Sequence, residues 1–223
     1  MYTEGPADLA VITNILKGVL DIDKSDIKYD LPDLEFDETD LQNQKEKKFS
    51  NWTLVKKECE EREKISMFLE SFDAKRFVVI HIDTAERNEK GFEATNTKKE
   101  KTNAEYSIEL RNEVILKLNG WLKNNYSEKI AYGIAIEETD AWVLTIANTV
   151  KGDTAFKNDP KKYLKENWHL IVSKSAVKQL RNYSSFNCYS KLSEAFRKEK
   201  TLKPCRLKNK SLDDFCNDLL KFR

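Results

Sequence analysis

Apolar residues recur along the chain with two different spacings, and these spacings predict helices and strands in turn. Leu9, Ile12 and Leu16 fall on one face of a helix, directly after a Gly-Pro pair. Proline is favoured at the first position of a helix, so the pattern predicts a helix that begins near Pro6 or Ala7.

Two nearly continuous apolar runs have the composition of buried strands. They cover residues 77–82 and 130–136, and both are rich in β-branched side chains. Such runs are typical of strands that are buried on both faces of a parallel sheet. Between them, Ile108, Ile115 and Leu118 recur at helical spacing. The order helix, strand, helix, strand predicts an α/β fold, with a parallel sheet that carries helices on both faces.

The remaining segments are more polar or return to helical spacing. Residues 21–40 are acidic and favour a loop, and residues 83–103 are polar and lysine-rich and favour a long loop at a strand end. Within 52–69 we expect a helix whose inward positions include Met67, Phe68 and Leu69. Beyond residue 156 the pattern predicts helices at 174–182, 189–198 and 211–222.

The net charge of +1 hides two regions of opposite sign. Residues 157–223 carry 17 Lys and Arg against 7 Asp and Glu, a net charge of +10, and residues 1–156 have a net charge of −9. We therefore expect an α/β domain over 1–156, with an acidic and helical insertion at about 21–70, and a basic, mainly helical extension over 157–223 packed on it. An acidic region can hold divalent cations and a basic one phosphates, although both can also be ordinary solvated faces.

Composition also narrows the class of protein. No apolar run approaches the length of a membrane span, and the first residues lack the pattern of a secretory signal, so we expect a cytoplasmic protein with no membrane partner. The four cysteines show no Cys-x-x-Cys spacing, which argues against a zinc cluster or a disulfide framework.

Acidic residues follow each predicted strand. Asp83 ends the first apolar run, Glu137, Glu138 and Asp140 follow the second, and Glu4 lies near the start of the chain. In an open α/β sheet, ligands bind at the carboxyl ends of the strands, where these side chains would converge. Carboxylates brought together bind a cation or hold protons, and oxygen ligands favour Mg²⁺ or Mn²⁺. The alternative for each residue taken alone is a helix N-cap.

Three motifs in order resemble the Toprim domain shared by topoisomerases, primases and the overcoming-lysogenization-defect nucleases. They are Glu4-Gly5-x-x-Asp8 at the start of a helix, Asp83-Thr84 after a buried strand, and the Glu-Glu-x-Asp-Ala-Trp stretch within 136–142. The last motif is similar to that of a bacterial family of stand-alone Toprim-like proteins. Segments 158–161 and 184–186 fit the same family loosely.

The resemblance implies a Toprim-like Rossmannoid sheet and a Mg²⁺- or Mn²⁺-dependent nuclease that cleaves DNA or RNA. It implies a prokaryotic anti-phage defence or toxin system as the biological setting, with nucleic acid and either an ATPase partner protein or a second copy of the chain as partners. Glu4, Asp83 and Glu138 would be catalytic. The implied metal ligands are Glu4, Asp8, Asp83, Glu86, Glu138 and Asp140.

Two departures from the Toprim pattern leave alternatives open. Toprim domains place a second Asp two residues after the first, and here that position is Ala85. Either Glu86 substitutes for it, or the protein is naturally inactive, or an engineered substitution removed the acid. The alternatives to a nuclease are therefore a catalytically inactive nucleic-acid-binding or regulatory partner subunit, and a hydrolase of small phosphoesters. Only three residues precede Glu4, so the first strand must be very short or the start truncated.

Basic and aromatic residues alternate in the C-terminal part, as they do in grooves that bind nucleic acid. The candidate phosphate contacts are Arg181, Lys191, Arg206 and Lys208, although lysines of this kind can also serve solubility alone. Within the first strand we expect His81 to be a hydrogen-bonded core residue. Three lysines of the following loop are weaker candidates for a phosphate contact: Lys98, Lys99 and Lys101.

Overall fold

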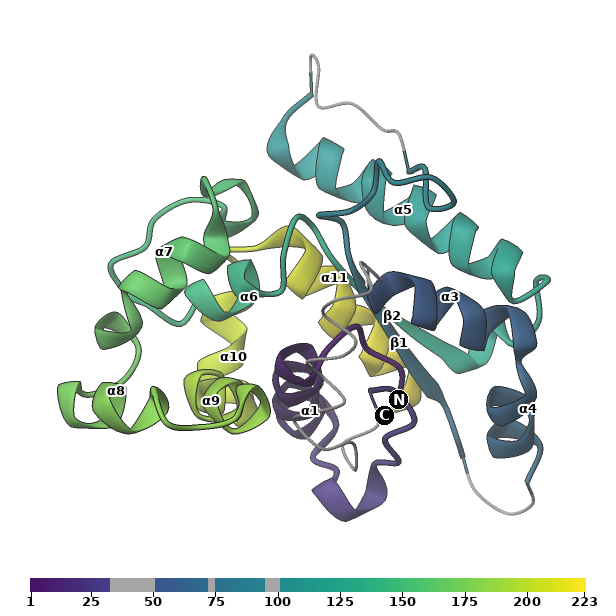
Figure 1. Ribbon diagram of the computed structural model, residues 1–223, viewed down its shortest axis with the longest axis horizontal. Coiled ribbons are helices and arrows are strands. Elements are labelled where there is room, and N and C mark those ends of the chain that lie inside the picture. The colour runs from purple at the N-terminus through teal and green to yellow at the C-terminus, as the bar shows by residue number, and fades with distance from the viewer. Residues whose placement is uncertain (33–50, 72–74, 95–100) are drawn as a thin grey trace.

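The computed structural model describes residues 1–32, 51–71, 75–94 and 101–223 (Figure 1). The predictions for Lys98, Lys99 and the second half of the acidic stretch lie outside these residues.

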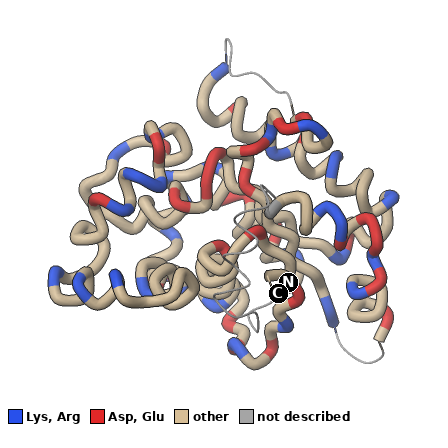
Figure 2. The backbone as a smooth tube through the Cα atoms, in the orientation of Figure 1, with Lys and Arg blue, Asp and Glu red and all other residues tan. Residues whose placement is uncertain are grey.

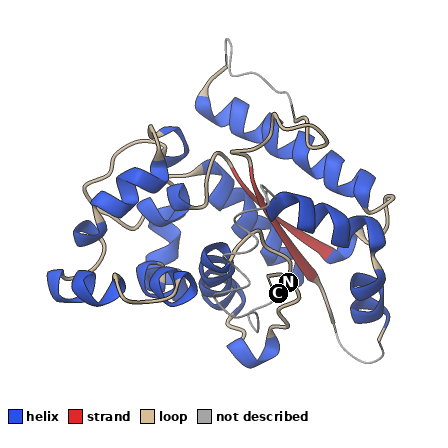
Figure 3. Ribbon diagram, viewed as in Figure 1, coloured by secondary structure: helices blue, strands red, loops and turns tan. Residues whose placement is uncertain are grey.

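A pair of parallel strands lies at the centre of the fold (Figure 3). β1 (Val78–Asp83) and β2 (Ile130–Ala135) align so that Asp83 lies opposite Ala135. Helix α5 (Asn103–Trp121) forms the connection between them. Both strands predicted from the apolar runs are confirmed, with ends that differ by one residue. The protein is thus a mostly helical α/β protein with a small parallel sheet.

Tyr2 adds a strand of a single residue beside β1. Its amide donates to the carbonyl of Val79 at 2.9 Å, and its carbonyl accepts from the amide of His81 at 2.8 Å. Leu31 forms a parallel bridge to the other side of Tyr2. The segment before Glu4 is therefore in register with β1 through a single residue.

The two faces of the sheet carry different helices because side chains alternate along each strand. Val78, Ile80 and Ile82 pack in one apolar cluster with α5, α3 (Asn51–Glu61) and α4 (Glu63–Glu70). The opposite face carries α1 (Pro6–Leu20) and α11 (Lys210–Leu219). A methyl group at Gly133 would lie 3.4 Å from Phe215 of α11, so the small residue allows this close approach.

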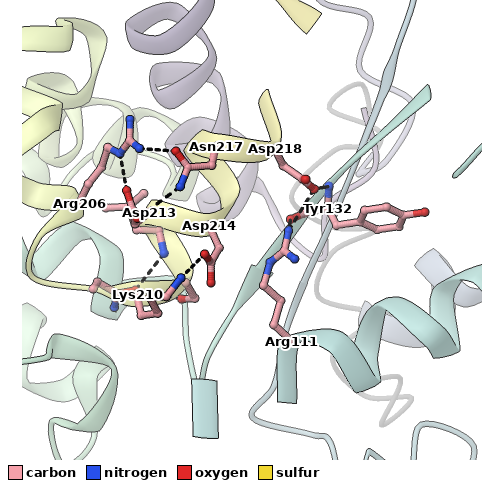
Figure 4. A network of polar contacts seen from close by, with 11 residues as sticks. Arg111, Tyr132, Arg206, Lys210, Asp213, Asp214, Asn217 and Asp218 are labelled. Atoms are coloured by element: carbon pink, nitrogen blue, oxygen red, sulfur yellow. Dashed lines mark hydrogen bonds and ion pairs between the residues drawn. The ribbon is translucent and has the colours of Figure 1, made fainter. Parts of the chain in front are cut away.

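Helix α11 also covers the open edge of β2 (Figure 4). The amide of Tyr132 donates to Asp218 Oδ2 at 3.1 Å, and Arg111 Nη2 donates to the same oxygen at 3.0 Å. The amide of Ile136 donates to Ser211 Oγ at 3.3 Å. Side chains of α11 thus satisfy backbone donors that a further strand would otherwise pair.

The C-terminal half consists of short helices. α9 packs against α1, whereas α7 and α8 lie in a lobe away from the strands (Figure 1). The helices are α6 (Asp140–Leu144), α7 (Pro160–Glu166), α8 (Lys174–Leu180), α9 (Ser185–Leu192) and α10 (Glu199–Arg206). Single 3₁₀ turns occur at Lys24–Asp26, Ser127–Lys129, Thr154–Phe156, Trp168–Leu170, Glu194–Arg197 and Leu220–Phe222.

Several helix predictions need correction. The helix expected at 52–69 is divided at Arg62, whose φ of 59° is left-handed, and Met67 is 68% exposed rather than inward. On α5, Ile108 is 39% exposed, because the buried face instead runs along Leu110, Val114 and Leu118. The predicted helices at 189–198 and 211–222 each end earlier, in a 3₁₀ turn. Within the described residues, no helix has both the length and the apolar content that a membrane span requires.

Candidate metal centre

Three carboxylates meet where β1 ends. Glu4 follows the single-residue strand, Asp83 is the last residue of β1, and Glu86 lies in the turn after it. One oxygen from each side chain lies within 4.8 Å of the others. We call these three residues the acidic triad. The triad forms because parallel strands present their carboxyl ends at the same edge of the sheet.

Backbone amides orient two members of the acidic triad. Asp83 donates its amide to Glu4 Oε1 at 2.7 Å, and Ala85 donates its amide to Asp83 Oδ1 at 3.1 Å. Each bond restrains one oxygen of a carboxylate. The two carboxyl groups are therefore positioned by the backbone without an ion.

Burial dominates the electrostatics of the acidic triad. It raises the pKa of Glu4 well above its usual value, and the charges of Asp83 and Asp8 raise it further. Burial likewise raises the pKa of Asp83, followed by the charges of Asp8 and Glu86. Carboxyl groups in such a place bind protons or a cation. A donor set made only of carboxylate oxygens fits Mg²⁺ or Mn²⁺, which are hard cations.

Asp8 lies beside the triad, in the first turn of α1, and belongs to a buried hydrogen-bond chain. Its carboxylate bonds to the hydroxyl of Thr139, and Thr139 Oγ1 lies 2.9 Å from His81 Nε2. Burial lowers the pKa of His81 to about 3, so the ring is neutral. One arrangement satisfies these contacts: Nε2–H donates to Thr139, and the Thr139 hydroxyl donates to Asp8. His81 is thus the hydrogen-bonded core residue that we expected.

Glu138 and Asp140 form a second acidic group, held by different partners. Glu138 Oε2 accepts from the amide of Lys161 at 3.0 Å, and Asp140 accepts from the hydroxyl of Tyr189. Burial raises the pKa of both carboxyl groups. Neither belongs to the triad that converges within 4.8 Å, although the charge of Glu138 contributes to the raised pKa of Asp83. The six predicted ligands therefore interact electrostatically, but only Glu4, Asp83 and Glu86 among the described residues come close enough to share an ion.

A cavity of about 610 Å³ lies next to these acids. Its walls include Ala85, Glu138, Phe156 and Asp159. Figure 2 shows several acidic segments in this central part of the molecule, between helix α5 and the lobe of α7 and α8. Ala85, whose amide bonds to Asp83, is thus also a wall residue of this cavity.

The ends of β1 and β2 are joined by Thr84 and Glu137, and by Arg87, which the sequence analysis did not single out. Thr84 Oγ1 accepts from the amide of Glu137 at 2.7 Å, and Arg87 Nη1 lies 3.1 Å from Glu137 Oε2. These contacts accompany a left-handed φ of 63° at Glu137. Glu137 is therefore engaged by Arg87. Thr84 follows Asp83, and Thr139 lies between Glu138 and Asp140. This adjacency to motif acids is the feature of the sequence that could have indicated their structural roles.

Most of the predicted phosphate contacts have partners within the chain. Lys208 Nζ donates to the carbonyls of Thr145 and Ala147 at 2.9 and 3.1 Å. The other contacts are Arg206 with Asp213 at 2.7 Å, Lys191 with Glu194, and Lys101 with Glu109. Arg181 is exposed just after α8.

Comparison with known proteins gives no further assignment. No protein-family model matches the chain, and neither the curated proteins nor the solved structures searched contain a match.

Proposed function

We propose that this protein is a Mg²⁺- or Mn²⁺-dependent nuclease that cleaves phosphodiester bonds in DNA or RNA at the acidic triad. The observation that carries the proposal is the convergence of Glu4, Asp83 and Glu86 within 4.8 Å at the carboxyl end of β1. The motif resemblance to Toprim domains implies Glu4 and Asp83 as well, and Glu86 as a possible substitute for the second Toprim acid.

The residues have distinct roles in this proposal. Glu4, Asp83 and Glu86 would hold the ion, which supplies charge neutralisation at the attacking and leaving oxygens when bound. Asp8 and Thr139 keep the start of α1 in place beside the triad. Glu138 lies on the wall of the cavity beside the triad and would exchange a proton with the leaving oxygen; burial raises the pKa of its carboxyl group.

The biological setting of the proposal rests on the resemblance alone. Toprim-like effectors suggest a role in a prokaryotic anti-phage defence or toxin system, together with an ATPase partner or a second copy of the chain. A fold does not fix a function, so this setting is a hypothesis separate from the chemistry.

A specific observation favours a second candidate, an inactive nucleic-acid-binding or regulatory subunit. Ala85 occupies the position of the second Toprim acid, and its methyl group lies on the wall of the cavity beside Glu138. A missing carboxylate at this point would leave an ion with fewer ligands and would weaken catalysis.

The two candidates separate in a cleavage assay on plasmid DNA, single-stranded DNA and tRNA with Mg²⁺ or Mn²⁺. The variants are Ala85→Asp, Asp83→Asn and the double variant, with Glu128→Gln as a control at an exposed acid away from the triad. We expect cleavage by the natural sequence, stimulated by Ala85→Asp and abolished by Asp83→Asn in either background.

Other outcomes identify the alternatives. Cleavage by Ala85→Asp alone would favour the inactive subunit, and turnover of dinucleotides without polymers would favour a small phosphoester hydrolase. No turnover by any variant, or turnover that persists in Asp83→Asn, would contradict a nuclease centred on the triad.

A further inference from the structure

On three of the described helices, α1, α3 and α11, a lysine is followed four residues later by an acid that pairs with it. Lys17 pairs with Asp21 at 2.9 Å, and Lys56 pairs with Glu60 at 3.8 Å. The same spacing joins Lys57 to Glu61 and Lys210 to Asp214. Pairs of opposite charge at this spacing stabilise a helix by about 0.2–0.5 kcal/mol.

Helices α7 and α8 instead each carry two lysines at this spacing. On α7, Lys161 is followed four residues later by Lys165, and on α8, Lys174 is followed by Lys178. Like charges at this spacing destabilise a helix by a similar amount. A polyanionic partner would remove this repulsion when it binds.

These helices belong to a basic lobe, which we define as residues 157–183. The lobe contains seven Lys and Arg and two Asp and Glu, and six of the seven basic residues are exposed. Among the described residues, no ion pair involves any of the seven. Figure 2 shows the positive segments along α7 and α8. Their charges are therefore available to a partner.

The first helix of the basic lobe, α7, contacts the second acidic group through Lys161. The amide of Lys161 bonds to Glu138, and the charge of Lys161 lowers the pKa of Asp8, Glu138 and Asp140 against the effect of burial. A strand bound along the lobe would thus reach the cavity beside the acidic triad.

The side chains of the lobe favour nucleic acid over an anionic membrane. Tyr183, 46% exposed, is the single large apolar side chain that the lobe exposes. A helix that inserts into a membrane surface carries an apolar face, which one tyrosine does not provide. An exposed ring next to Arg181 instead offers a platform on which a base can stack.

We infer that the basic lobe binds the phosphate backbone of single-stranded DNA or RNA and leads it to the acidic triad. Lys174, Lys178 and Arg181 lie at positions i, i+4 and i+7 of one face, about 10 Å along the helix axis. The delivery of the strand for cleavage rests on the proposed function, whereas the binding does not.

The test measures binding of fluorescent single strands to the full chain in EDTA, where a metal-dependent reaction cannot interfere. The lobe variant is Lys174→Gln, Lys178→Gln, Arg181→Gln. The control variant, Lys57→Gln, Lys123→Gln, Lys129→Gln, has the same change in net charge at exposed positions elsewhere. A further variant, Tyr183→Ala, removes the stacking platform at an exposed site.

We expect the lobe variant to bind roughly 50-fold more weakly at physiological salt, with a salt slope smaller by about 2, since each phosphate contact in a single strand contributes about 0.7. Tyr183→Ala should weaken binding at least about fivefold. The control variant should bind as the natural protein does.

Equal binding by the lobe and control variants would overturn the inference. It would also be overturned if the lobe variant lost binding to anionic phosphatidylserine vesicles but not to nucleic acid. Binding in EDTA without any cleavage in Mg²⁺ would support the lobe while contradicting the proposed nuclease, so the two failures are distinguishable.

Discussion

Glu4 Oε1 accepts a hydrogen bond of 2.7 Å from the backbone amide of Asp83, and this bond joins two acidic residues that lie 79 positions apart in the sequence. It forms because Tyr2 pairs with β1, which places Glu4 beside the end of that strand. The bond keeps two half-buried acidic residues side by side despite the repulsion between their charges.

The metal-free protein should lose stability as the pH rises. Glu4 and Asp83 ionise near pH 4 in the unfolded chain, and burial raises the pKa of both in the folded chain. Between these pKa values the folded state binds more protons than the unfolded state, so the free energy of unfolding decreases as pH increases. Urea unfolding in EDTA at pH 5 and pH 8 measures this.

Glu4→Gln tests the cause of this pH dependence. The amide oxygen can still accept from Asp83, but the charge is gone, so the loss of stability between pH 5 and pH 8 should be smaller than in the natural protein. Glu128→Gln, at an exposed site, should leave the loss unchanged. An identical loss in Glu4→Gln and the natural protein would show that the pair does not interact.

Asp218 should contribute more to stability than other acids of α11. Asp218→Ala leaves Arg111 buried without its carboxylate and exposes the amide of Tyr132, a loss of about 3–5 kcal/mol in the free energy of unfolding. Asp214→Ala removes a pair with Lys210 nearer the surface and should cost about 1 kcal/mol or less. Urea unfolding measures the loss of stability in each variant, and hydrogen exchange measures the protection of the Tyr132 amide. Equal losses in Asp218→Ala and Asp214→Ala would contradict a special role for Asp218.

Thr139 should be sensitive to loss of its hydroxyl. Thr139→Val keeps the shape of the side chain but leaves His81 Nε2 and the Asp8 carboxylate without their shared partner, which should cost about 1–3 kcal/mol. Thr139→Ser retains the hydroxyl and should restore most of the stability and the natural ¹⁵N shifts of the His81 ring. Unchanged ring shifts in Thr139→Val would refute the hydrogen-bond chain.

The sequence predicts the central strands because their burial on both faces requires continuous apolar runs, as at 78–82 and 130–136. The helix after Pro6 follows from its spacing in the same way. The meeting of Glu4 with Asp83 follows in outline from the rule that parallel strands share one carboxyl edge. The break at Arg62 has no such signal, since a left-handed φ at arginine depends on tertiary contacts.

The division of the acids into two groups also depends on tertiary structure. Glu138 is drawn toward the amide of Lys161, and Asp140 toward Tyr189, partners that are distant in the sequence. The role of Lys208 at the carbonyls of Thr145 and Ala147 is likewise invisible in a count of charges. Charge patterns indicate what a segment can bind but not which of its side chains are already engaged.

Calorimetric titration of the metal-free protein with Mg²⁺ and Mn²⁺ tests the acidic triad most directly. We predict binding of a divalent ion with release of protons, seen as a heat that depends on the buffer, because the raised pKa values fall when the ion binds. Asp83→Asn should weaken binding by about tenfold to a hundredfold or more, and Glu138→Gln, outside the triad, should weaken it less. Absence of binding, or equal binding by Asp83→Asn and the natural protein, would contradict a metal centre at this site.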